Sequence, residues 1–192
     1  MPDDAVTEDT SSETAGDDAR MSVQTGLCLE IEIAALSAAE DDSEALINRA
    51  ARVALDMALT GPMPPMELFV KLVNDAEIQL LNQQYRSKNH ATNILSFPGV
   101  EPDDLPDTMK LAAQGGPPVL LGDLIIASAI VRTEAVEQSK SVGDHLSHLT
   151  VHGVLHLLGY DHINDIDAEE MEGLEREILA QLSIADPYEA DE

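Results

Sequence analysis

Three of the chain's six histidines lie in the segment TVHGVLHLLGYDH, residues 150–162. The first two, His152 and His156, are four residues apart, and His162 follows at the end of the segment. Residues four apart on an α-helix share a face and lie roughly 6 Å apart along its axis, so two such imidazoles can bind one metal ion. The alternative is that these are histidines of the protein core, each with its own hydrogen-bond partner.

The third histidine decides between these alternatives. Gly159 stands between His156 and His162, and glycine readily adopts the left-handed conformation that ends a helix and turns the chain back. His148 lies on the same helical face, but about 12 Å along the axis from His156, which is too far to share an ion. The spacing H-x3-H-x5-H therefore predicts one metal ion bound by all three histidines of the segment. Three neutral ligands leave a fourth position for water, which is typical of a catalytic site.

The same ligand spacing occurs in the metzincin proteases, whose motif is H-E-x-x-H-x-x-G-x-x-H. In that motif the glutamate removes a proton from water at the zinc ion. Gly153 occupies its position in this chain. The sequence therefore predicts the metal ligands of such a site but lacks the base for peptide hydrolysis at this position.

Acidic residues dominate the chain and gather at its ends. Thirty-seven acidic residues against ten basic ones give a formal net charge of −27. Residues 1–20 carry seven acids and one Arg, and residues 161–192 carry twelve acids and one Arg. Such a charge disfavours non-specific binding of nucleic acid, so a polyanionic substrate would need a cation or a local basic patch. The segment YRSKNH, which begins at Tyr85 and contains Arg86, supplies such a patch.

The hydrophobic pattern mixes strands with helices. Alternating or continuous apolar residues predict strands, and apolar residues at helical spacing predict helices. The segment 99–118 holds four of the ten prolines and is expected to be a loop or a long hairpin connection. This order indicates a single α+β domain: a small mixed sheet of about four strands packed with helices, and a central helix carrying the metal-binding histidines. The expected strands are 27–33, 66–73, 92–98 and 119–127, and the expected helices are 41–59, 74–86, 128–139, 145–158 and 165–182.

We expect three parts along the chain. Residues 1–22 are predicted to be a disordered acidic extension, residues 23–184 the metal-dependent domain, and residues 185–192 an acidic tail. The N-terminus lacks the pattern of a signal peptide, and no apolar run is long enough to span a bilayer. The single cysteine, Cys28, cannot form an intramolecular disulfide and is expected to be a core thiol. These features favour a cytoplasmic protein.

Three segments carry a resemblance to a known family. HGVLHLLGYDH closely resembles the motif of the YbeY family of bacterial metal-dependent endoribonucleases, also called ribosomal RNA maturation factors. LNQQYRSKNHATNILSFP (81–98) and LGDLIIA (121–127) are similar to two further segments of that family, in the same order. The resemblance covers roughly residues 25–182. Asn93 stands where the commoner form of the second segment has aspartate.

The resemblance implies a single-strand-specific, zinc-dependent endoribonuclease, a hydrolase that cleaves the phosphoester bonds of RNA. It implies a role in 16S rRNA 3′-end maturation and ribosome quality control. One Zn2+ per chain would be bound by His152, His156 and His162, and Arg86 would be the basic catalytic residue of the substrate cleft. The implied partners are single-stranded RNA such as the 16S rRNA precursor, the small ribosomal subunit with its proteins, and a ribosome-assembly GTPase; no membrane is implied.

The residues alone leave several roles open. Asp123 or Asp161 could orient a ligand imidazole, and Asp123 could instead accept hydrogen bonds from backbone amides. Tyr85 could stack on a base or pack in the fold. Two other functions also remain: a metallohydrolase with a different substrate, including a peptidase with a base from elsewhere, and a ribosome-assembly factor whose metal is mainly structural.

Overall fold

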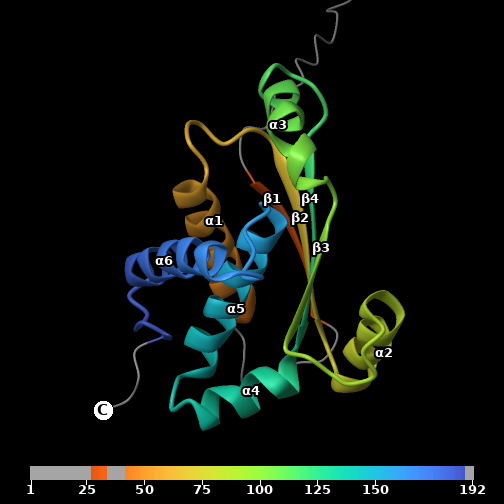
Figure 1. The fold of residues 1–192 in the computed structure, drawn as a ribbon, viewed down its shortest axis with the longest axis vertical. Helices are drawn as coiled ribbons and strands as arrows, with labels where there is room; N and C mark the ends of the chain where they lie inside the picture. Colours follow the sequence, from red (N-terminus) through yellow and green to blue (C-terminus); the bar gives the residue numbers. More distant parts are fainter. Residues whose placement is uncertain (1–26, 34–41, 189–192) are drawn as a thin grey trace, which may run out of the picture.

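The computed structural model describes residues 27–33 and 42–188, which form a four-stranded mixed sheet covered by helices (Figure 1). The strands β1, β2 and β4 are parallel, and β3 pairs antiparallel with β4 at the edge. This confirms the predicted α+β fold and its four strands. In spatial order the strands are β1 (Leu27–Ile33), β2 (Met66–Val73), β4 (Val119–Ala127) and β3 (Ile94–Pro98).

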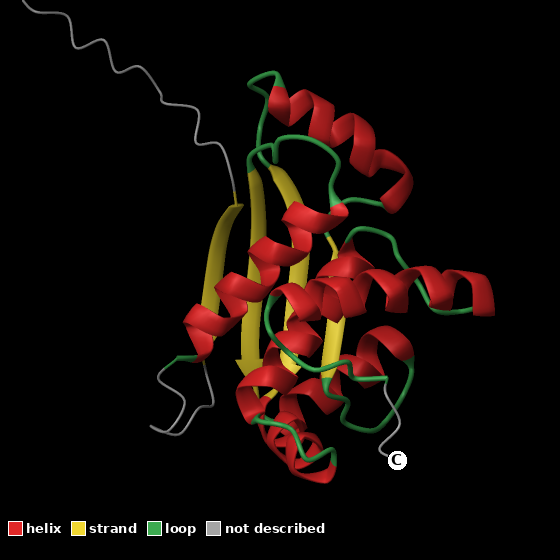
Figure 2. Cartoon of the chain, turned by 90° about the vertical axis from the view of Figure 1, so that its left-hand side faces the viewer, coloured by secondary structure: helices red, strands yellow, loops and turns green. Residues whose placement is uncertain are grey.

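The helices cover the two faces of the sheet unequally. Helices α1, α5 and α6 lie on one face, and α2 lies against the other (Figures 1 and 2). Helix α5 packs against α1, α4, α6 and the strands β3 and β4, so the histidine helix is central, as predicted. The helices are α1 (Ser43–Ala58), α2 (Asp75–Arg86), α3 (Leu105–Ala113), α4 (Ser128–Glu137), α5 (Val142–Leu157) and α6 (Asp165–Gln181).

Alternate residues of the strands supply two separate hydrophobic clusters, because successive side chains of a strand point to opposite faces. Ile94 and Leu124 belong to the main core with α1 and α5. Leu95 and Ile125 pack with Ile78 of α2 in the second cluster. The sheet therefore separates α2 from the histidine helix.

Two predictions of secondary structure need correction. Segment 99–118 joins the antiparallel strands β3 and β4, as a long hairpin connection would, but it is not only a loop. It contains a 3-10 turn, η1 (Pro102–Asp104), and helix α3, each with a proline in its first turn. Proline fits there because the first turn lacks intrahelical partners for its N–H groups, so prolines alone did not exclude a helix. Helix α5 begins at Val142 rather than at 145, since the Ser141 hydroxyl accepts a hydrogen bond from the backbone N–H of Asp144 at 2.9 Å.

Cys28 is exposed on β1 and is not a core thiol. Its apolar neighbours in sequence gave no guide to its orientation, because adjacent strand residues face opposite sides of a sheet. The predicted extension 1–22 and residues 189–192 of the predicted tail lie outside the described residues. Among the helices of the described ranges, none combines the length and the apolar character needed to cross a membrane.

Candidate metal centre

The three predicted ligands come together at the C-terminal end of α5. One ligand atom from each of His152, His156 and His162 lies within 4.8 Å of the others. The Nε2 atoms of His152 and His156 are 3.1 Å apart. The ring centre of His162 lies 5.6 Å from that of His152 and 5.1 Å from that of His156.

Gly159 makes the turn that brings His162 back to the helix, as predicted. Its φ of 96° is left-handed. The N–H of Gly159 donates to the carbonyl of His156 at 3.0 Å, and the N–H of Tyr160 donates to the carbonyl of Leu155 at 3.1 Å. This is a Schellman end, for which glycine is the preferred residue.

The second nitrogen of each of the two ligands on α5, His152 and His156, lies near an oxygen atom. The Nδ1 atom of His156 lies 3.0 Å from the backbone oxygen of Tyr160. The Nδ1 atom of His152 lies 3.4 Å from Oε1 of Glu175. Both oxygens can only accept a hydrogen bond, so these contacts favour the form of each imidazole that carries hydrogen on Nδ1 and a lone pair on Nε2.

Two lone pairs therefore face one another across a gap that suits a cation. Facing acceptors repel when nothing lies between them, whereas a positive ion attracts both. Ligand atoms at 2.0–2.1 Å from a tetrahedral zinc ion lie about 3.3 Å apart, close to the observed separation. The donor set thus fits a divalent metal ion, and three imidazoles are a common set for catalytic zinc.

The surroundings of His156 favour its neutral form. Burial lowers the pKa of His156 below its ordinary value, and the neighbouring His152 and His162 lower it further. The hydrogen bond to Tyr160 acts in the opposite direction but is the smaller effect. Because a metal binds only the unprotonated nitrogen, a lowered pKa favours binding at neutral pH.

Glu175 of α6 supports the site and was missed from the sequence. Its side chain is 0% exposed. Its Oε1 lies 3.1 Å from Nε2 of His148 and 3.4 Å from Nδ1 of His152, in close contacts whose angles depart from ideal hydrogen bonds. Burial alone raises the pKa of this carboxyl, but the two imidazoles outweigh it and bring the pKa to about 2. The available signal was position: Glu175 falls on the buried stripe of α6 between Met171 and Ile178.

Neither of the two aspartates considered for this role forms a hydrogen bond with a ligand imidazole in the described residues. Asp123 is exposed beside Phe97, on the α2 side of the sheet, where partial burial raises its pKa. It is therefore separated from the histidines by the sheet. Asp161 accepts a hydrogen bond from the backbone N–H of His162 at 2.7 Å, so it fixes the loop rather than an imidazole.

Gly153 faces the sheet. A Cβ atom at this position would lie 2.7 Å from side-chain carbons of both Ile94 and Leu124. The position that holds the catalytic glutamate in the metzincin motif is therefore part of the protein core in this chain. Gly153 itself carries no base, and a side chain at this position would meet the sheet.

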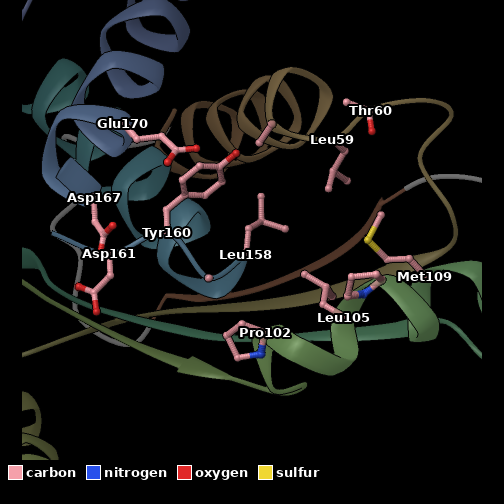
Figure 3. Close-up of a pocket in the computed structure, with 13 residues that line it drawn as sticks. Leu59, Thr60, Pro102, Leu105, Met109, Leu158, Tyr160, Asp161, Asp167 and Glu170 are labelled. Atoms are coloured by element: carbon pink, nitrogen blue, oxygen red, sulfur yellow. The ribbon is translucent and has the colours of Figure 1, made fainter. Parts of the chain in front are cut away.

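A cavity of about 660 Å³ opens beside the loop that carries His162 (Figure 3). Apolar side chains, including Leu105 and Met109, line one end, and the carboxylates of Asp161, Asp167 and Glu170 lie at the other. Residues 158–161, which join α5 to His162, line this cavity, but none of the three histidines does.

Arg86 is not brought to the histidines. It is the last residue of α2, on the opposite side of the sheet from α5 (Figure 1). Its side chain is exposed and forms no ion pair with any residue in the described ranges. Tyr85 packs edge-on against Phe97, with ring centres 5.1 Å apart, and remains 60% exposed.

The N-terminal half of α5 holds a separate polar cluster. Nε2 of the buried His145 lies 2.8 Å from Oε2 of Glu134, on α4. Asn93 donates to both oxygens of Glu134, at 3.3 and 3.1 Å, and accepts the N–H of Ile94 at 2.8 Å. An aspartate could not donate to Glu134, so the amide of Asn93 matches this partner.

Comparison with known proteins agrees with the motifs. A model of the family described as Endoribonuclease YbeY matches residues 30–183. A protein named Endoribonuclease YbeY from Parvibaculum lavamentivorans is 49% identical over 153 residues, which cover 79% of this chain and 80% of the relative. One from Pseudomonas putida is 46% identical over 164 residues, 85% of this chain and 96% of the relative. One from Stenotrophomonas maltophilia is 52% identical over 131 residues, 68% of this chain and 77% of the relative. With most of its length matched by the family model, this chain belongs to the Endoribonuclease YbeY family.

Proposed function

We propose that this chain is an endoribonuclease that uses a zinc ion held by His152, His156 and His162 to cut single-stranded RNA. The observation that carries the proposal is the pair of facing Nε2 atoms, 3.1 Å apart, with an oxygen atom beside each Nδ1. A bound zinc ion would stabilise charge on a phosphate and make water more acidic. Family membership supports RNA as the substrate.

The protein's own residues must attract a polyanion despite a net charge of −27. The metal centre contributes positive charge on one side of the sheet, and Arg86 contributes it on the other. Because β3 is the edge strand, an RNA strand that passes round this edge could meet both. In this proposal Arg86 binds phosphate oxygens through its forked donors, and the exposed ring of Tyr85 offers a surface on which a base can stack.

The biological setting follows from the sequence resemblance. We propose the 16S rRNA precursor as substrate, 3′-end maturation and ribosome quality control as the process, and the small ribosomal subunit and an assembly GTPase as partners. A cytoplasmic location stays a prediction. The acidic composition favours contact with basic ribosomal proteins. The same observation supports the second candidate function, an assembly factor whose metal is mainly structural.

The test is a cleavage assay on a single-stranded RNA, with and without a chelator, for the full-length protein. We expect the chelator or His152→Ala to abolish cleavage, and added zinc to restore the chelated wild type. Arg86→Ala should lower cleavage by about a hundredfold or more, the scale of losing one electrostatic stabiliser, without loss of zinc. Arg86→Lys should restore part of it, because lysine keeps the charge but not the fork.

Lys110→Ala, which removes an exposed cation on α3, is the matched control and should cleave normally. Cleavage that survives complete removal of the metal would refute the proposed chemistry. A metal-bound but inactive wild type would favour the assembly factor. If Arg86→Ala unfolds the protein or loses zinc, then Arg86 serves the fold instead of the substrate.

A further inference from the structure

A buried carboxylate connects the metal centre to the C-terminal segment of the chain. One oxygen of Glu175 faces the imidazoles of His148 and His152, at 3.1 and 3.4 Å. Its other oxygen accepts the hydrogen bond of the Tyr188 hydroxyl. Glu175 thus has a contact on each side and no exposure to solvent.

The contact with His152 favours one nitrogen of this imidazole as the free one. A carboxylate oxygen attracts an N–H group and repels a nitrogen lone pair. It therefore favours the form of His152 that carries hydrogen on Nδ1. The lone pair then lies on Nε2, which faces His156. The negative charge of Glu175 also makes the imidazole a stronger ligand for a cation.

The position of Glu175 depends in turn on residues after α6. Arg176 Nε lies 3.4 Å from Oδ2 of Asp186, and the Arg176 guanidinium lies 5.0 Å from the ring centre of Tyr188. The backbone N–H of Tyr188 donates to Oδ1 of Asp186 at 2.8 Å. These contacts hold the segment 186–188 on α6 and aim the tyrosine hydroxyl at Glu175.

We propose that Glu175 is the positioning residue of the metal centre, and that Tyr188 holds its carboxylate against His152. The inference rests on the proposed function only in requiring that the three histidines bind a metal ion. It assigns to the C-terminal segment, which the sequence indicated only as acidic, a part in setting metal affinity.

The experiment measures the zinc affinity of full-length variants by competition with a chromophoric chelator. Glu175→Gln keeps the shape but removes the charge, and it should weaken zinc binding by about 10- to 100-fold, the usual effect of losing such a supporting carboxylate. Tyr188→Phe should weaken binding in the same direction by a smaller factor. Glu177→Gln, an exposed residue of the same helix, is the matched control and should bind zinc like the wild type.

A second measurement covers the case in which Glu175→Gln fails to fold. Nitrogen NMR of the metal-free wild type should show His152 protonated at Nδ1, and protonation at Nε2 overturns the proposal. If Tyr188→Phe lowers the melting temperature with unchanged zinc affinity, the contact between Tyr188 and Glu175 is only structural, and the role proposed for Tyr188 is overturned. A wild type that binds no zinc refutes the metal centre itself, whereas equal zinc affinity in wild type and Glu175→Gln refutes only the present inference.

Discussion

The two ends of helix α5 carry the same residue types in different arrangements. At the N-terminal end, His145 contacts Glu134 through Nε2, and its buried Nδ1 has no hydrogen-bond partner among the described residues. At the C-terminal end, His152 contacts Glu175 through Nδ1, and its Nε2 faces that of His156. Each end therefore pairs a histidine with a carboxylate from a neighbouring helix.

The difference teaches that a histidine–carboxylate pair does not by itself make a metal site. What matters is where the remaining nitrogen points. At His145 it is buried without a hydrogen-bond partner, and His145 belongs to no group of three possible metal ligands among the described residues, so the pair only joins α4 to α5. At His152 it points to another lone pair and to the loop after Gly159, so a cation can bind all three ligands.

The largest expected effect is on metal binding at the two ends. His156→Ala removes a ligand and should weaken zinc affinity by about a hundredfold or more. This loss should exceed that of Glu175→Gln, which removes only a residue that supports a ligand. His145→Asn should leave zinc affinity unchanged, because that imidazole is not among the three ligands. Metal analysis and chelator competition on the purified proteins measure both. Equal losses in the two variants would show that the ends are not distinct.

The next effect concerns the middle of α5, which places both ends against the sheet. Gly153→Ala should lower the free energy of unfolding by about 1–3 kcal/mol, because the new methyl group would crowd Ile94 and Leu124. Gly173→Ala in α6 has open space around its Cβ and should instead stabilise by about 0.5–1 kcal/mol. Urea denaturation of the two variants measures the contrast. A Gly153→Ala protein as stable as the wild type would mean that this close packing is wrong.

The smallest expected effect is a pH dependence from the N-terminal end. Burial lowers the pKa of His145 below its ordinary value of 6.5, although Glu134 acts in the opposite direction. As the pH drops below about 6.5, His145 becomes protonated in the unfolded chain but stays neutral in the folded protein. Protonation therefore favours the unfolded chain, and the free energy of unfolding falls. In chelated protein, His145→Asn should show a shallower fall between pH 7.5 and 5.5 than the wild type. Identical slopes would assign the dependence to other groups.

The sequence was sufficient for the parts of the site that lie on one segment. His152 and His156 share a face because of helical periodicity, and Gly159 allows the left-handed turn that returns His162. The strands at 66–73 and 119–127 also followed from their apolar runs.

Contacts between distant segments could not be read in this way. Glu175 and Tyr188 reach the histidines only through the packing of α6 on α5, and local spacing carries no information on that packing. Similarly, the basic segment at Arg86 was expected to share a cleft with the histidine helix, but the sheet lies between α2 and α5. Helix α3 was missed because prolines in a first turn resemble those of a loop.

The most direct test of the metal centre is anomalous diffraction at the zinc edge from crystals of the zinc-loaded protein. We predict one strong peak per chain, about 2.0–2.1 Å from Nε2 of His152, from Nε2 of His156 and from one ring nitrogen of His162. A peak at any other position, or the absence of a peak here in protein that contains one zinc ion per chain, would contradict the account.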